Sequence, residues 1–216
     1  MSTSIAELTG LKKAYGHFRV IDDVTMELNS GEIIVLSGPN GSGKTTLIRM
    51  ICGLELADSG TIRIQGVINP GQRSDVRKKI GYCPQKPVVW NTLTPGEQLR
   101  FIGKLYGMKP QTVDLAVKGL VDEFKLEGII DKRTNQLSAG NRQLINLLLS
   151  LVHQPLIILL DEPTVSLDSP TRDRVLRYLR FLVKNRARTL LLVTHQVEEA
   201  EEIADKYLTL EAGRLV

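Results

Sequence analysis

A glycine-rich segment, residues 38–46, lies between an apolar stretch ending at Ser37 and a helix-like stretch beginning at Leu47. It fits the pattern G-x-x-x-x-G-K-S/T at every defined position. Glycines let backbone amides turn inward around an oligophosphate, and the start of the following helix adds positive potential. An ordinary Gly-rich turn would not need this strand-loop-helix context. The segment therefore predicts a nucleoside triphosphate site, formed by Asn40, Gly41, Ser42, Gly43, Lys44, Thr45 and Thr46, with Lys44 at the terminal phosphates and Thr45 binding Mg²⁺.

Two carboxylates, Asp161 and Glu162, directly follow the wholly apolar run 156–160. Ligands of parallel sheets bind at the carboxyl edge of the strands, which is where this pair would lie. Asp161 is suited to hold Mg²⁺, directly or through water. Glu162 is free to polarise a water molecule for attack on the γ-phosphate. The alternative, a helix N-cap pair, predicts no such chemistry.

The elements that position these residues alternate between strands and helices. We expect strands at 156–160 and 189–193 and helices at 141–152, at 170 to about 184, and at 197–204. Strands that are apolar on both faces and alternate with helices indicate a parallel sheet covered on both sides. Residues 5–36 instead show short alternating runs, broken at Gly10, Gly16 and residues 29–31, which favours a strand-rich N-terminal sheet. Residues 60–64 and 80–83 supply further strands.

Composition turns helical between residues 94 and 124. Apolar residues recur at helical spacing in 95–106 and in 112–124, and Gly107 and Pro110 separate the two predicted helices. We therefore expect a single domain over 1–216, with residues 1–85 and 137–216 as the core and a helical lobe over about 86–136.

Composition sets limits on the class of protein. The chain has 216 residues, 42% hydrophobic and 24% charged, a normal globular balance. No apolar run approaches the length of a membrane span, and residues 1–4 lack a signal-peptide pattern, so we expect a cytoplasmic chain. Cys52 and Cys83 lie in apolar segments without metal-ligand spacing and are expected in the core. The net charge of +4 comes from scattered basic residues, which favours a solvated surface over nucleic-acid binding.

Further motifs make a family recognisable. Residues 137–141, Leu-Ser-Ala-Gly-Asn, resemble the LSGGQ signature of ATP-binding cassette (ABC) proteins, and residues 166–168, Ser-Leu-Asp, resemble their D-loop. His195 matches the switch histidine, Tyr15 the adenine-stacking aromatic and Gln85 the Q-loop glutamine. Over essentially its whole length, and with the motifs in the expected order, the chain resembles the nucleotide-binding subunit of ABC transporters.

That resemblance implies an α/β P-loop fold of ABC type, with a mostly parallel central sheet, an N-terminal antiparallel β subdomain and an inserted α-helical subdomain. It implies an ATPase that uses ATP and Mg²⁺, with Thr45, Gln85 and Asp161 at the metal. Glu162 would orient the attacking water, while Lys44, Gln85 and His195 complete the catalytic set. Ser138 and Gly140 would clamp the γ-phosphate bound to a second nucleotide-binding subunit, in a homodimer or heterodimer. Integral membrane permease subunits would be the partners, at the inner face of the cell membrane.

Two signature positions depart from the family pattern. Ala139 adds a methyl group where the family has glycine, and Asn141 is one methylene shorter than the usual glutamine. Ser138 and Gly140, the expected phosphate contacts, are retained. We expect a working but slower site, and the double change Ala139→Gly with Asn141→Gln should raise the ATPase rate. An unchanged rate would remove this concern.

The segment after Gln85 carries Val88, Val89 and Trp90 in a turn-like stretch. These residues are expected either to form the groove that receives a cytoplasmic helix of a membrane subunit or to pack under the helical lobe. Residues 93–101 and 104–108 look most like the exporter branch of the family. The alternative function is a soluble ABC ATPase that moves no solute, such as one of the iron-sulfur cluster assembly type.

Overall fold

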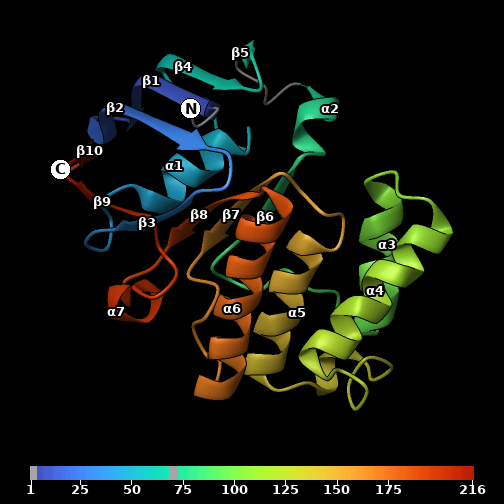
Figure 1. The fold of residues 1–216 in the computed structure, drawn as a ribbon. Coiled ribbons are helices and arrows are strands. Elements are labelled where there is room, and N and C mark those ends of the chain that lie inside the picture. Colours follow the sequence, from blue (N-terminus) through green and yellow to red (C-terminus); the bar gives the residue numbers. More distant parts are fainter. Residues whose placement is uncertain (1–3, 69–72) are drawn as a thin grey trace.

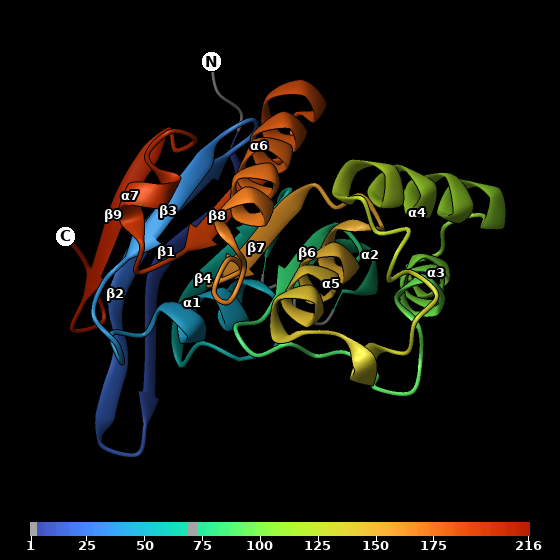
Figure 2. The ribbon, with the colours of Figure 1, turned by 90° about the horizontal axis from the view of Figure 1, so that it is seen from below.

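The computed structural model of the chain describes residues 4–68 and 73–216. The expectation of no leader sequence rests partly on residues 1–3, which lie outside this range. Two sheets form the framework, and the longer helices lie on the side of the second sheet that faces away from the first (Figures 1 and 2). Along the described chain, no helix combines the length and apolar character that crossing a bilayer requires.

The first sheet is antiparallel, with the strand order β2-β1-β4-β5. Its strands are β1 (Ser4–Tyr15), β2 (Phe18–Asn29), β4 (Ser59–Ile64) and β5 (Val67–Ile68). β1 and β2 form a long hairpin, seen extending from one end of the molecule in Figure 2. Tyr15 pairs with Phe18 across its turn. The hairpin therefore ends at the predicted adenine-stacking residue.

The second sheet has the order β10-β9-β3-β8-β7-β6. Its strands are β3 (Ile33–Ser37), β6 (Ile80–Cys83), β7 (Ile157–Asp161), β8 (Thr189–Val193), β9 (Lys206–Glu211) and β10 (Arg214–Leu215). All neighbours pair in parallel except β10, which runs antiparallel to β9. The predicted mostly parallel sheet is confirmed.

Alternate residues of the parallel strands enter two separate cores, as the two-residue period of a strand requires. Ile34 and Leu36 pack with α1 (Lys44–Ile51) and the antiparallel sheet. Ile33 and Val35 pack in the core that the longer helices cover, namely α3 (Pro95–Leu105), α4 (Pro110–Phe124), α5 (Ala139–Leu151) and α6 (Ser169–Arg186). Both faces of the sheet are thus buried, and this explains why β3, β7 and β8 are apolar throughout. Cys52 and Cys83 are buried in these cores, as expected.

The helical segment between β6 and α5 lies to one side of the sheet (Figure 1). It contains α3, α4 and the short 3₁₀ helix Thr134–Gln136. Thr94 caps α3 in a capping box, because its hydroxyl accepts from the Glu97 amide while the Glu97 carboxylate accepts from the Thr94 amide. Leu99 and Val113 from these helices share one apolar core with α5. The segment is therefore packed on the signature helix.

Several predicted elements need correction. Residues 197–204 were expected as one helix, but α7 covers only Val197–Ala200. Gly10 does not end a strand: with φ +59° it forms an irregularity inside β1, where the register with β2 shifts. Pro110 does not lie between the two helices but begins α4, where the backbone N–H that proline lacks has no acceptor within the helix. β3 was grouped with the N-terminal sheet and belongs to the parallel one. Strands β9 and β10 and helix α2 (Ser74–Arg77) were not predicted.

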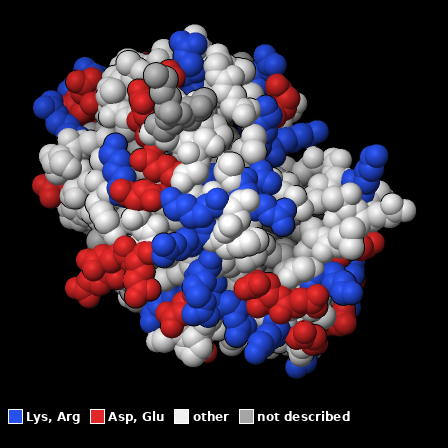
Figure 3. Space-filling model, viewed as in Figure 1, with Lys and Arg blue, Asp and Glu red and all other residues white. Residues whose placement is uncertain are grey.

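Charged residues of both signs share the surface. Figure 3 shows Lys and Arg along the middle of one face, with Asp and Glu to either side. Some of them are paired, as where the Lys184 ammonium lies 2.6 Å from an Asp205 carboxylate oxygen. This intermixing fits the expected solvated surface.

Candidate nucleotide-binding site

The turn between β3 and α1 depends on its glycines. Gly38 has φ +140°, and a Cβ there would lie 2.2 Å from the carbonyl oxygen of Leu210 on β9. Gly43 has φ +107°, and a Cβ there would lie 2.6 Å from the Val20 carbonyl oxygen. Gly41 also has a positive φ, +79°, but among residues 4–68 and 73–216 no atom lies within 4 Å of its Cβ position. Two glycines are thus required by packing, and the third by backbone conformation alone.

Lys44 is folded back into this loop. Its ammonium donates to the carbonyl oxygens of Gly38 and Pro39, at 2.7 and 2.9 Å. The side chain is nearly buried, so the loop carbonyls hold a cation inside the turn. Ser42 lies beside it, and its buried hydroxyl oxygen has no hydrogen-bond partner among the described residues. A cation and an unsatisfied hydroxyl within one cradle suit an anionic ligand.

Thr45 and Asp161 meet although they are far apart in sequence. The Thr45 hydroxyl donates to Asp161 Oδ2 at 2.7 Å, and Asp161 is 2% exposed. Burial raises the pKa of the Asp161 carboxyl, and the nearby Glu162 carboxylate raises it further. A bound cation would offset both effects. The hydroxyl and carboxylate oxygens are ligands that Mg²⁺ prefers, so the residues present fit this ion.

Glu162 follows β7 and has a positive φ of +50°. Its Oε1 accepts hydrogen bonds from the His195 backbone amide at 3.0 Å and from His195 Nδ1 at 2.8 Å. Its other oxygen, Oε2, is buried and without a hydrogen-bond partner in the described chain. One oxygen is therefore held by the end of β8 while the second keeps its acceptor capacity. Positive backbone angles outside glycine often mark functional positions.

Tyr15 is 50% exposed at the end of the β1–β2 hairpin. The Lys13 ammonium lies 5.5 Å from the centre of its ring. Asp58 accepts from that ammonium at 3.1 Å and from the backbone amide of Ala14 at 2.7 Å. These bonds fix the residues immediately before Tyr15, so the exposed ring stands on an ordered support.

A pocket of about 560 Å³ brings most of the predicted site together. It is lined by Tyr15, Val20, Asn40, Gly41, Ser42, Gly43, Lys44, Thr45, Thr46, Gln85, Asp161 and Glu162. Three predicted site residues lie outside this lining. His195 bonds to the pocket residue Glu162, whereas Ser138 and Gly140 belong to the start of α5.

The signature residues contact their own chain in this structure. The Ser138 hydroxyl accepts from the Asn141 amide at 3.2 Å and caps α5. A Cβ on Gly140 would lie 2.7 Å from the Ser166 carbonyl oxygen in the predicted D-loop. Because even a methyl group would clash there, Gly140 lets the start of α5 pack directly on the segment that follows Glu162.

Two buried amide side chains on α5 were not predicted. Gln143 Nε2 donates to the carbonyl oxygens of Glu162 and Pro163, at 3.4 and 3.2 Å. Asn146 bonds to the segment around Gln85. The available signal was the i, i+3 spacing of two amides, the second of which is the one polar residue within residues 144–149. Such residues are easily assigned to a solvated face.

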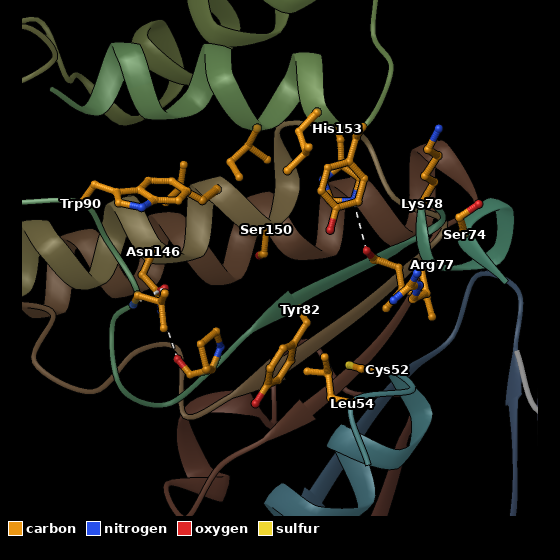
Figure 4. Close-up of a pocket in the computed structure, with 17 residues that line it drawn as sticks. Cys52, Leu54, Ser74, Arg77, Lys78, Tyr82, Trp90, Asn146, Ser150 and His153 are labelled. Atoms are coloured by element: carbon orange, nitrogen blue, oxygen red, sulfur yellow. Dashed lines mark hydrogen bonds between the residues drawn. The ribbon is translucent and has the colours of Figure 1, made fainter. Parts of the chain in front are cut away.

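A second, larger pocket of about 690 Å³ lies between the parallel sheet and the helical segment (Figure 4). Trp90, Tyr82, Asn146, Ser150 and His153 point into it (Figure 4), and Val88 also lines it. Val88 and Trp90 are 65% and 42% exposed. The neighbouring Val89 is partly buried against the helical core. Val89 thus packs under the helical lobe, as one of the two interpretations expects, whereas Val88 and Trp90 line an open pocket.

Comparisons with known proteins agree with this geometry. The model of the family described as ABC transporter matches residues 21–165. The Nod factor export ATP-binding protein I of Mesorhizobium japonicum is 35% identical over 213 residues, 99% of this chain and 62% of that protein. The protein of the same name from Ralstonia nicotianae is 34% identical over 215 residues, 100% of this chain and 67% of that protein. The chain thus spans about two thirds of the length of these relatives.

Solved structures show the same fold. An ATP-binding subunit of an ABC transporter superposes with a TM-score of 0.91 at 29% identity, covering 98% of this chain and 88% of that one. A dimeric ATP-binding cassette in a post-hydrolysis state, bound to ADP and Pi, superposes with a TM-score of 0.89 at 26% identity, covering 97% and 96%. The predicted fold class is confirmed, and because the family model also matches more than half of its length, the chain belongs to the ABC transporter family.

Proposed function

We propose that the protein binds and hydrolyses ATP and thereby powers a membrane exporter. The observation that carries the proposal is the pairing at Glu162. One carboxylate oxygen is held by His195, and the other is buried and unpartnered in the same pocket as Lys44 and the Thr45–Asp161 pair. Such an oxygen is placed to accept a hydrogen bond from an attacking water.

Each pocket residue then has a defined task. The Lys44 ammonium exchanges its two loop carbonyls for phosphate oxygens, and the adenine ring stacks on Tyr15. Thr45, Asp161 and Gln85 would hold Mg²⁺, which neutralises charge on the phosphates when bound. Glu162 Oε2 orients the water. His195 keeps the Glu162 carboxylate in place and, with its ring half-exposed, contacts the γ-phosphate.

The site needs a second subunit to be complete. Ser138 and Gly140 lie outside the pocket lining, while the exposed Ser138 hydroxyl and the start of α5 offer hydrogen-bond donors to an anion. We infer that they close over the γ-phosphate bound to a partner copy or homologous subunit. The dimeric state in the name of the superposed cassette supports this arrangement.

The membrane partners bind at the pocket of about 690 Å³ that Val88 and Trp90 line, which forms a groove on the surface. This groove is open, mainly apolar and connected to Gln85 through the intervening loop. An integral membrane permease subunit would place a cytoplasmic helix there, which puts the protein at the inner face of the membrane. Export as the direction rests on the names of the relatives from M. japonicum and R. nicotianae. In this arrangement, residues 86–136 act as a subdomain of a single ATP-binding domain formed by 1–85 and 137–216.

The test is Glu162→Gln, with Glu127→Gln as a matched control at an exposed position outside the pocket. Glu162→Gln should leave ATP affinity unchanged, lower Mg²⁺-dependent phosphate release by a factor on the order of 10² or more, and make ATP-bound dimers accumulate in size-exclusion chromatography. Glu127→Gln should behave as the wild type. Near-normal turnover of Glu162→Gln would refute the assigned role.

The membrane assignment has a separate test. Tagged protein purified from detergent-solubilised membranes should bring along a multi-span membrane protein. A wholly soluble pool without such a partner would contradict the transport function while leaving the ATPase assignment intact.

A further inference from the structure

Asn146 lies on α5, lines the groove and is 3% exposed. Its side-chain nitrogen donates to the Pro84 carbonyl oxygen at 3.0 Å and to Cys83 Sγ at 3.2 Å. Its side-chain oxygen accepts from the Val88 backbone amide at 3.0 Å. The donors and the acceptor of one amide are thus all engaged by a single short segment of chain. Figure 4 shows Asn146 between Trp90 and Tyr82, with its bond to the Pro84 carbonyl dashed.

The two residues whose backbone bonds to Asn146, Pro84 and Val88, lie on either side of Gln85 in the sequence. Pro84 precedes Gln85 directly, and Val88 follows it by three residues. Gln85 lines the nucleotide pocket, whereas Pro84 and Val88 line the groove. Displacement of Val88 by a ligand in the groove would therefore act on the same amide that fixes the residue before Gln85.

The chain beyond Val88 is anchored by a second amide. The fully buried Gln98 on α3 accepts from the Trp90 amide at 2.9 Å and donates to the Trp90 carbonyl oxygen at 3.0 Å. Side-chain hydrogen bonds from two helices thus hold residues 84–90 at both ends. Asn146 on α5 binds residues 84 and 88, on either side of Gln85, and Gln98 on α3 binds Trp90.

We propose that Asn146 is a positioning residue. Its hydrogen bonds to Pro84 and Val88 hold Gln85 in place relative to both the nucleotide pocket and the groove. This inference rests on the proposed function for the catalytic importance of Gln85, but the clamp itself can be tested without nucleotide. Asn146 touches no expected substrate atom, so its effect on hydrolysis must pass through Gln85.

The first experiment measures hydrogen exchange of residues 84–90 in the nucleotide-free protein. Asn146→Ala should speed exchange in this segment about 10-fold, which corresponds to about 1.4 kcal/mol and lies within the range expected for a lost hydrogen bond. Asn146→Asp keeps the volume and the acceptor for Val88 but, when ionised, places a buried negative charge against the Pro84 carbonyl oxygen, so exchange should speed at least as much as in Asn146→Ala. Thr189→Ala is the matched control, because Thr189 is also buried, lies outside the linings of both pockets, and has a hydroxyl that donates to the Asn29 carbonyl oxygen.

The second experiment is a double-mutant cycle in ATP hydrolysis. Asn146→Ala should lower kcat about 10-fold while ATP affinity stays within about 2-fold. In a Gln85→Ala background, the same change should have no further effect. Thr189→Ala, outside both pockets, should leave kcat unchanged in both backgrounds.

Unchanged exchange at 84–90 in Asn146→Ala would overturn the clamp, whatever the enzyme does. Faster exchange with equal kcat losses in the wild-type and Gln85→Ala backgrounds would overturn the route through Gln85, because a general loss of stability predicts that result. A wild-type protein with no ATPase activity would instead overturn the proposed function, and the exchange result would still decide the clamp.

Discussion

His153 predicts a measurable pH dependence of folding. Its ring stacks on Tyr106 of α3, with ring centres 3.8 Å apart, and its Nε2 donates to the Ile80 carbonyl oxygen at 3.1 Å. That bond makes Nδ1 the unprotonated nitrogen, and Nδ1 is buried without a partner among the described residues. A second proton would therefore have no acceptor. Burial lowers the pKa of His153 from 6.5 to about 4.

Because the pKa of His153 is lower in the folded chain than in the unfolded chain, folding stability depends on pH. Between about pH 6.5 and pH 4 the unfolded chain takes up a proton on His153 that the folded chain resists, so stability falls as pH falls. Each pH unit in this interval is worth about 1.4 kcal/mol, which makes the whole effect about 3 kcal/mol. Lowering the pH from 7 to 5 covers more than half of the interval and should cost about 2 kcal/mol. Above pH 7 the contribution is constant.

The assay is urea unfolding at pH 7 and pH 5 for the wild type and His153→Phe. Phenylalanine keeps a ring against Tyr106 and takes up no proton, so the stability lost between the two pH values should shrink by about 2 kcal/mol. Other titrating groups, including the buried Asp161, are common to both proteins and cancel. His17→Phe, at an exposed turn position, should keep the full wild-type dependence. Equal losses in the wild type and His153→Phe would refute the reasoning.

Two further predictions concern the nucleotide pocket. Gly38→Ala should abolish nucleotide binding, because its Cβ would meet the Leu210 carbonyl oxygen. Gly41→Ala has open space around its Cβ and should cost only about 1 kcal/mol of backbone strain. Calorimetric binding and thermal melts would separate the two variants, and equal behaviour would contradict the packing argument. Asp58→Ala removes a hydrogen-bond acceptor for Ala14 and Lys13, so ATP affinity should fall by up to about 10-fold. Inorganic tripolyphosphate has no base to stack on Tyr15 and should bind as before. Equal losses of affinity for both ligands would exclude a role through Tyr15.

The sequence predicted most of the residues that line this pocket, because much of the pattern that identifies them is local. The pattern from Gly38 to Thr46 contains both the backbone freedom and the charge that a phosphate loop needs. Asp161 and Glu162 were found because β7 is apolar on both faces, which placed them at a sheet edge. The contact of Thr45 with Asp161 then follows from the two strands sharing that edge, although neither residue alone indicates it.

The errors arose where distant contacts decide local structure. The helix expected over 197–204 stops at Ala200, and Asp205 then accepts from the Ile33 amide at 2.8 Å and pairs with Lys184. No periodicity within residues 197–204 reveals this pull from β3. β9 was missed because its polar residues, Lys206 and Thr209 among them, give a weak strand pattern that pairing with β3 overrides.

The amides of α5 are the clearest limit of sequence analysis, and they also join the separate motifs physically. α5 begins at the signature residues, carries Gln143 bonded to the carbonyls of Glu162 and Pro163, and then carries Asn146 bonded around Gln85. A helix has no internal freedom over two turns, so these three attachments move together. In the proposed dimer, a shift of the start of α5 toward a partner's nucleotide would therefore also move the groups bonded to Glu162 and to the segment around Gln85. Through its hydrogen bonds α5 thus joins the signature residues to both of these segments, which the separate motifs in the sequence do not reveal.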